Sequence, residues 1–139
     1  MTEITLFEAQ CAHCRRHFAH PDLGDFVYGE VLLCTRDGQH HARVSAFTPF
    51  SKRVEALMSP SDDRSLWSIL ASLADPVSGV PLTFGLRCPH CASGQMVYWG
   101  GKRAGVIDVP EATFTDAAAL SDEELGRRVA AVERNGLPS

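Results

Sequence analysis

The sequence lacks the features of a membrane-inserted or exported chain. No apolar run approaches the roughly 20 residues that a membrane-spanning helix needs. The first four residues, Met-Thr-Glu-Ile, lack the basic and then apolar layout of a signal peptide. With 139 residues, 45% hydrophobic and 22% charged, the chain has the composition of one ordinary globular domain. We therefore expect a single cytoplasmic domain over residues 1–139 that makes no membrane contact.

The chain also lacks an excess of positive charge. It has 13 Lys and Arg residues against 17 Asp and Glu residues, which gives a net charge of -4. Its basic clusters are pairs, at residues 15–16, 52–53 and 102–103. A domain that binds nucleic acid through the phosphates usually shows a clear basic excess. The composition therefore disfavours nucleic acid as the partner.

Familiar catalytic motifs are missing as well. The sequence has no Gly-x-Ser-x-Gly nucleophile motif, no Gly-x-x-x-x-Gly-Lys phosphate loop and no His-Glu-x-x-His zinc motif. The glycine pair at residues 100–101 does not fit the phosphate-loop pattern and reads as a hairpin turn. These absences favour a protein that is not an enzyme.

Five cysteines carry most of the information. Four form two Cys-x-x-Cys pairs, at residues 11–14 and 88–91, and the fifth is Cys34. An odd count without an export signal argues against a disulfide framework. A tight turn of this spacing can aim two thiolates at one point about 2.3 Å from a zinc ion, and two such turns complete a tetrahedron. Soft thiolates select zinc or iron over hard cations. The sequence therefore predicts one structural Zn²⁺ with four ligands, Cys11, Cys14, Cys88 and Cys91.

In these two pairs the chain resembles the zinc-ribbon class of proteins, in which two Cys-x-x-Cys knuckles on β-hairpins hold one zinc ion. The resemblance covers the knuckles and implies that their four cysteines are the ligands. Residues 15–87 separate the pairs, whereas a compact ribbon separates them by about 15–20 residues. Ala92 and Ser93 stand where ribbon knuckles often have glycine. The resemblance implies a ribbon with an insertion over residues 15–87, or another fold that brings two knuckles together.

Two other interpretations of the knuckles stay open. The segment 88–91, Cys-Pro-His-Cys, looks like the dithiol of thioredoxin-like oxidoreductases, where it opens a helix. Here Gly94 and the β-branched and aromatic residues of 96–99 predict a turn and a strand instead. His17 follows Cys14 by three residues and could replace a cysteine as a ligand.

Cys34 ends the apolar run 31–34 and is predicted to be a small buried hydrophobic residue. The alternative role is a catalytic nucleophile. His40 and His41 are then the candidate bases, and the protein would be a thiol-dependent enzyme.

The local patterns predict an α+β fold, with antiparallel β-hairpins around the four-cysteine site and two main packing helices. Strand patterns occupy residues 4–9, 26–34, 41–47, 80–87, 95–99 and 104–109, with loop signals at 20–22 and an Asp-Gly hairpin turn at 37–38. A short helix is expected over 52–58. One main helix begins at a Ser61 cap and presents Leu66, Ile69, Leu70 and Leu73. The other covers about 121–135, with Ser121 and Glu124 as a capping box and Gly136 after its end.

A small, acidic, zinc-containing domain without catalytic motifs suits a protein that acts by binding another protein. The classes we expect are an adaptor, an inhibitor or an immunity-type protein that neutralises a toxin. The alternative is a nucleic-acid-binding or transcription-related protein that uses an aromatic and basic strip beside the knuckles. The residues of that strip are Arg15, Arg16, Phe18, Tyr98, Trp99, Lys102 and Arg103.

Overall fold

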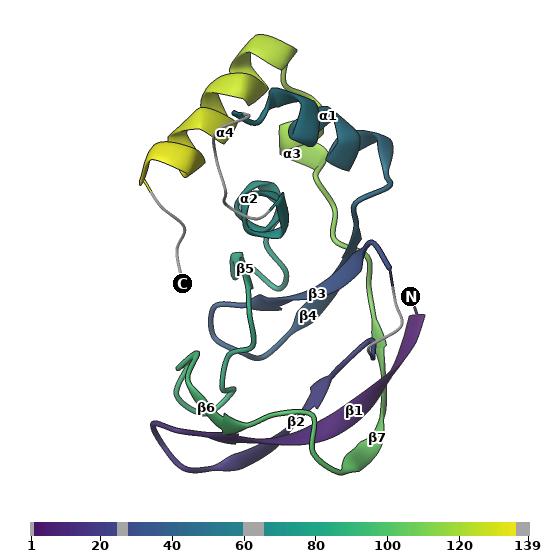
Figure 1. Cartoon of the computed structure of the whole chain (residues 1–139), viewed down its shortest axis with the longest axis vertical. Helices are drawn as coiled ribbons and strands as arrows, with labels where there is room; N and C mark the ends of the chain where they lie inside the picture. The colour runs from purple at the N-terminus through teal and green to yellow at the C-terminus, as the bar shows by residue number, and fades with distance from the viewer. Residues whose placement is uncertain (1, 25–27, 60–65, 136–139) are drawn as a thin grey trace.

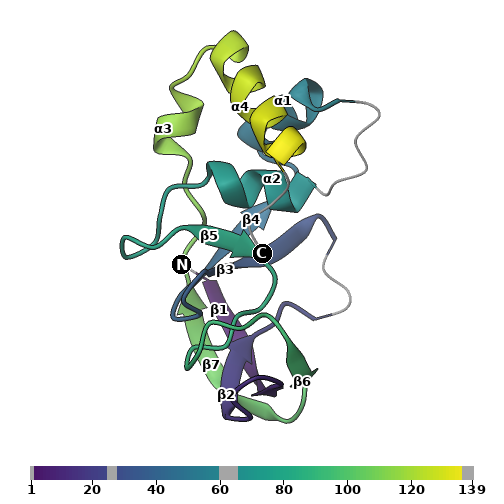
Figure 2. The ribbon, with the colours of Figure 1, turned by 90° about the vertical axis from the view of Figure 1, so that its left-hand side faces the viewer.

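A computed structural model of the chain describes residues 2–24, 28–59 and 66–135 (Figure 1). It has the predicted α+β fold, with strands in two antiparallel sheets and with helices gathered at one end (Figures 1 and 2). The strands are β1 (Thr2–Cys11), β2 (His17–Pro21), β3 (Glu30–Thr35), β4 (His41–Ser45), β5 (Leu82–Phe84), β6 (Met96–Tyr98) and β7 (Arg103–Val109). The helices are α1 (Pro49–Leu57), α2 (Leu66–Leu73), α3 (Thr115–Ala118) and α4 (Asp122–Asn135). None of these helices is long and apolar enough to cross a membrane.

The first sheet is built around β1, and we call it, with the two Cys-x-x-Cys turns, the knuckle lobe. β2 pairs with one edge of β1, while β6 and β7 share the other edge. The predicted loop signal at His20 and Pro21 is wrong, because both residues pair with β1 at the end of β2. Proline is tolerated there because β2 is an edge strand, whose outward side needs no N–H donor.

The second sheet and the helices form what we call the helical lobe. β3 lies between β4 and β5, and the β3–β4 hairpin turns at the predicted Asp-Gly pair. Helices cover one face of this sheet (Figure 1). Apolar side chains from the sheet and all four helices form one core cluster. It buries the predicted α2 positions Ile69, Leu70 and Leu73, and the predicted Leu66 packs against it partly buried. Its buried members are Leu33, Ala42, Val44, Val54, Ile69, Leu70, Ala71, Leu73, Leu82, Ala117, Leu125 and Val129.

Helix ends follow local capping chemistry. α1 begins earlier than predicted, because Thr48 caps it and Pro49 fits its first turn. The preceding strand β4 ends at Ser45, two residues before the predicted end at 47. The Ser121 hydroxyl accepts the Glu124 N–H at 3.1 Å at the start of α4, which is the serine half of the predicted capping box. The Glu124 carboxylate pairs with Arg127. The Ser61 cap and the Gly136 position lie outside the described residues.

Two further elements differ from the sequence-based expectation. β5 is shorter than the predicted strand over 80–87, because the chain leaves the sheet after Phe84 through Gly85, whose φ is +120°. The short helix α3 was not predicted. The Asp75 carboxylate fixes its start by accepting hydrogen bonds from the Thr115 N–H at 2.8 Å and the Thr113 hydroxyl at 2.7 Å.

The chain after β7 joins the two lobes. Arg43 of β4 donates its N–H to the Pro110 carbonyl at 2.8 Å, and its own carbonyl accepts the Ala112 N–H at 2.8 Å. Its guanidinium pairs with Glu30 at 3.0 Å and Glu111 at 2.9 Å. The helical lobe is therefore assembled from chain on either side of the second knuckle, namely residues 30–59, 66–84 and 111–135.

Candidate metal centre

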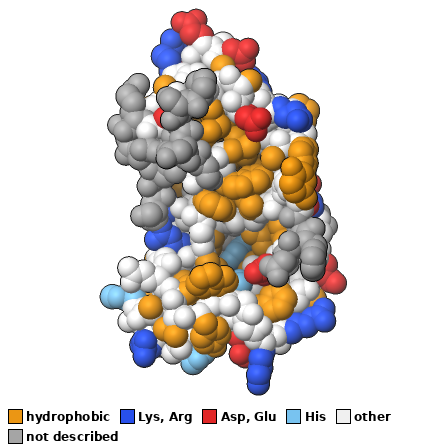
Figure 3. All heavy atoms as spheres, viewed as in Figure 1, with side chains coloured by type: hydrophobic (Ala, Val, Ile, Leu, Met, Phe, Trp, Pro, Cys, Tyr) orange, Lys and Arg blue, Asp and Glu red, His pale blue; other side chains and the backbone are white. Residues whose placement is uncertain are grey.

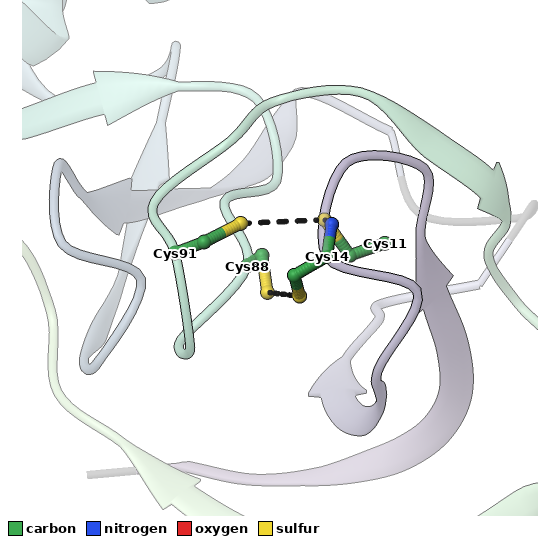
Figure 4. Close-up of side chains that lie close together, drawn as sticks. All are labelled: Cys11, Cys14, Cys88 and Cys91. Carbon is green, nitrogen blue, oxygen red and sulfur yellow. Dashed lines mark hydrogen bonds between the residues drawn. The ribbon is translucent and has the colours of Figure 1, made fainter.

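The four paired cysteines meet at one point between the two knuckles (Figure 4). Their Sγ atoms all lie within 4.8 Å of one another, with 3.5 Å between Cys11 and Cys91 and 3.7 Å between Cys14 and Cys88. Four sulfurs placed about 2.3 Å from a tetrahedral zinc ion lie about 3.8 Å apart. The spacing of the cluster therefore fits a tetrahedral ion at its centre.

The two knuckles have the same backbone conformation. In the first, the Cys11 N–H bonds the Arg16 carbonyl at 3.0 Å and the Arg15 N–H bonds the Cys11 carbonyl at 3.1 Å. In the second, the equivalent bonds join Cys88 to Ser93 at 2.9 Å and Ala92 to Cys88 at 2.8 Å. Two segments that are far apart in sequence thus adopt the same turn conformation. This indicates that the Cys-x-x-Cys spacing sets the conformation of each knuckle.

Each knuckle directs backbone N–H groups at the sulfur of its first cysteine. The Cys11 Sγ accepts from the His13 N–H at 3.3 Å and the Cys14 N–H at 3.4 Å. The Cys88 Sγ accepts from the His90 N–H at 3.3 Å. Such donors favour a thiolate over a thiol, because they stabilise negative charge on sulfur. The turns are therefore preorganised for charged sulfur ligands.

Residues with positive φ close both turns. Arg15 has a φ of 67° and Ala92 has a φ of 66°. Residues other than glycine adopt this left-handed region of the backbone at a cost of about 1–2 kcal/mol. Both residues directly follow the second cysteine of their knuckle, at the position where the sequence departs from the glycine common in ribbons. The structure shows that the turn forms without glycine at these two positions.

The long strand β1 explains how cysteines so far apart in sequence come together. Cys11 ends β1 and is opposite Met96 of β6, which follows the second knuckle. The Ala12 N–H also donates to the Gln95 carbonyl at 2.9 Å. Pairing of β6 with the end of β1 therefore sets the two knuckles side by side.

The β3–β4 turn of the helical lobe supports the second knuckle from outside. A Cβ at Gly38, whose φ is +77°, would lie 2.6 Å from the Cys88 carbonyl oxygen and 2.7 Å from that of Arg87. The neighbouring Gln39 side-chain amide donates to the Pro89 carbonyl. Sequence reasoning identified the turn at Gly38 but not its contact with the knuckle, because the two segments are distant in sequence.

Burial and electrostatics divide the four sulfurs. Cys11 and Cys88 are fully buried, Cys14 is half-buried and Cys91 is exposed. Burial acts to raise the pKa of Cys11, but the Cys14 N–H, the Cys91 thiol and the His13 N–H outweigh it and bring the pKa to about 6. Burial raises the pKa of Cys88 to about 12. These opposite pKa shifts favour one thiolate in the cluster, at Cys11. A bound cation would allow several thiolates to coexist there.

The other candidate residues lie outside this cluster. His17 is not part of the cluster, which consists of the four cysteines. It is exposed on β2, and its ring centroid lies 6.2 Å from that of Tyr98. The second knuckle leads into strand β6 and not into a helix, as its sequence predicted. Cys34 is 3% exposed, which confirms its predicted burial, and that burial raises its pKa to about 11.

Comparison with protein families, with curated proteins and with solved structures found no match for this chain.

Proposed function

We propose that the cluster of Cys11, Cys14, Cys88 and Cys91 holds one zinc ion as a structural site of the zinc-ribbon kind. The main support is the spacing of the four Sγ atoms, which fits a tetrahedral ion. The N–H groups directed at two of the sulfurs are a second support. Four sulfur ligands fill a tetrahedral ion, so a bound zinc would cross-link the two knuckles and would keep no open position for a substrate.

We infer that the protein is not an enzyme and that it acts by binding another protein, as an adaptor, inhibitor or immunity-type protein. The closed ligand set supports this inference. A nucleophilic role for Cys34 is not favoured, because a thiol with a pKa of about 11 stays protonated near neutral pH. Exposed aromatic side chains support the presence of a surface that binds this partner.

The surface we propose for the partner is the Tyr28–Phe47 pair. Tyr28 is 86% exposed, Phe47 is 53% exposed, and their ring centroids lie 5.7 Å apart. A Cβ at Gly29 would lie 2.1 Å from the Phe47 ring, so this ring lies directly over the glycine backbone. Lys52 places its Nζ 5.7 Å from the centre of the same ring. Aromatic side chains already held in place make good anchors, because little side-chain entropy is lost on binding.

The test is affinity capture of the full chain from its native host, with the wild type compared with Phe47→Ser. The matched control is Ile107→Ser on β7, which removes an apolar side chain of similar exposure elsewhere on the surface. We expect one protein that binds the wild type and Ile107→Ser, binds Phe47→Ser at least about tenfold more weakly, and does so again when purified. Equal capture by all three chains would contradict the proposed surface.

The alternative partner, nucleic acid, has its own test. The basic pairs of the predicted strip flank the first knuckle and the β6–β7 turn. Fluorescence anisotropy with single-stranded and duplex probes should show weak or no binding near physiological salt, because the net charge is -4. Micromolar binding with a steep salt dependence would favour the nucleic-acid function instead.

A further inference from the structure

A cleft of about 370 Å³ lies between the two lobes, away from the four cysteines. The knuckle lobe contributes residues 20–24 and Trp99 to its walls, and the helical lobe contributes residues 30–34 and 84–86. Figure 3 shows a hollow at the waist of the molecule, with apolar side chains above and below it and with histidine and acidic side chains inside. Its volume falls within the range of about 300–1,000 Å³ that is typical of small-molecule sites.

The formal charge around this cleft is negative. Asp22 and Glu30 line it, and no Lys or Arg is among its described lining residues. Arg87, whose charge partly offsets the effect of burial on the pKa of Cys34, does not line the cleft, and its guanidinium donates to the Ala92 carbonyl of the second knuckle at 3.2 Å. Glu30 pairs with Arg43, but Arg43 also pairs with Glu111, so two carboxylates share one guanidinium. An anionic ligand is therefore disfavoured and a cation is favoured.

Two further polar side chains of the cleft, His41 and Cys34, are uncharged near neutral pH. Burial lowers the pKa of His41 to about 4 and raises the pKa of Cys34 to about 11. The Nε2 of His41 is buried and has no hydrogen-bond partner among the described residues. A neutral imidazole does not oppose a cation in the cleft, because it carries no positive charge.

An exposed indole lies beside one of the carboxylates. Trp99 is 66% exposed and lines both the cleft and an adjoining hollow of about 260 Å³, and Asp22 also lines both. The next residue, Gly100, donates its N–H to the Nε2 of the buried His20 at 3.0 Å, which anchors the turn that carries Trp99. An anchored aromatic face next to a carboxylate is the arrangement that attracts an organic cation.

We propose that the cleft between the lobes binds a small organic cation, an ammonium group on an apolar or aromatic body, with Asp22 as its counter-charge and Trp99 as its aromatic wall. Phe84, Leu32 and Val31 line the same cleft and supply apolar surface for the body of the ligand. The proposal concerns a surface separate from the four cysteines and from the Tyr28–Phe47 pair, so it stands or falls independently of the proposed function.

The test compares three probes that share a phenyl ring and differ in charge: phenethylammonium, 2-phenylethanol and phenylacetate. Binding to the metal-loaded full chain is followed by NMR at the two indole N–H signals, assigned with Trp67→Phe. Trp67 is an internal control, because it packs against the core of the helical lobe. We expect phenethylammonium to shift the Trp99 signal saturably, with a Kd on the order of 1 mM. Phenylacetate should bind at least about tenfold more weakly than phenethylammonium, and 2-phenylethanol should have an intermediate affinity.

A charge variant separates this site from non-specific binding. Asp22→Asn should weaken phenethylammonium by about tenfold and leave 2-phenylethanol unchanged. Glu55→Gln, an exposed position on α1, removes the same charge elsewhere and should change neither. The proposal is overturned by an absent or unsaturable Trp99 shift, by equal affinities for the three probes, or by cation affinity that survives Asp22→Asn.

Discussion

Among its described residues, the helical lobe buries twelve hydrophobic ones in one cluster, drawn from three strands and four helices. The described part of the knuckle lobe buries five, namely Ile4, Ala9, Cys11, Cys88 and Val109, and two of these are cysteines. Apolar burial contributes stability roughly in proportion to the area removed from water. The helical lobe therefore has a conventional apolar core, whereas the described part of the knuckle lobe has little buried apolar surface apart from its β-sheet and the four-cysteine cluster. The stability of the knuckle lobe should therefore depend on a bound metal.

Metal removal should have the largest effect and should affect the two lobes unequally. A structural zinc ion contributes on the order of 10 kcal/mol in finger peptides, which is comparable with the about 5–15 kcal/mol net stability of a domain. We expect a strong chelator to abolish amide-exchange protection in β1, β2 and β6, while α2 and α4 keep part of theirs. Hydrogen exchange followed by NMR measures this, and added zinc should restore the loss. Equal loss in both lobes would mean that the helical lobe has no independent stability.

A core substitution tests whether the helical lobe takes its stability from its apolar core and not from the metal. Leu70 is fully buried in the core cluster, so Leu70→Ala should lower the free energy of unfolding by about 2–5 kcal/mol. The metal content should stay that of the wild type, because the knuckles do not contain this residue. Urea unfolding and elemental analysis of the same sample measure both quantities, with exposed Val106→Ala as the control. Loss of metal in the folded Leu70→Ala protein would show that the lobes are tightly coupled.

The contact between Gly38 and the second knuckle links the lobes, and Gly38→Ala tests it. The added Cβ would meet backbone oxygens at 2.6 and 2.7 Å, and overpacking of this kind costs about 1–3 kcal/mol. Gly79→Ala is the matched control, because Gly79 has a similar φ of +79° and open space around it. We expect Gly38→Ala to weaken zinc binding, measured by chelator competition, and Gly79→Ala to leave it unchanged. Equal zinc affinities would show that the turn does not position the knuckle.

The smallest predicted effect is a gain in stability at the knuckle itself. Ala92 has a φ of 66°, which glycine adopts without the steric cost of a Cβ. Ala92→Gly should therefore raise the free energy of unfolding of the metal-loaded protein by about 0.5–1 kcal/mol. Ala104→Gly in strand β7 is the control and should lower it by about 0.5–1 kcal/mol. Thermal unfolding of both variants decides the point, and destabilisation by Ala92→Gly would contradict this account of the turn.

The features that were predictable from the sequence are those with local signals. The β3–β4 hairpin follows from its Asp-Gly turn, and the apolar face of α2 follows from residues spaced three and four apart. The turn of each knuckle also follows from local spacing, since each Cys-x-x-Cys pair folds its own turn. Burial of Cys34 was expected from the apolar run that precedes it.

The remaining features depend on contacts between distant segments. The knuckles meet because β6 pairs with the end of β1, and no short pattern specifies which strand β6 will choose. The helical lobe recruits the chain after β7 through backbone bonds of Arg43. α3 is a single turn stabilised by Asp75, so its formation depends on a side chain forty positions away. Propensity and periodicity cannot identify such partners, because the pairing energy arises only in the folded chain.

The central claim is that one zinc ion is bound by all four paired cysteines. The most direct measurement is the zinc content of the purified wild-type chain and of the five single Cys→Ser variants. We expect about one zinc per wild-type chain and per Cys34→Ser chain, and a large loss for Cys11→Ser, Cys14→Ser, Cys88→Ser and Cys91→Ser alike. A folded wild-type chain without metal would contradict the claim. So would variants in which the 11–14 pair keeps its zinc while the 88–91 pair loses it, because the two pairs would then not share one site.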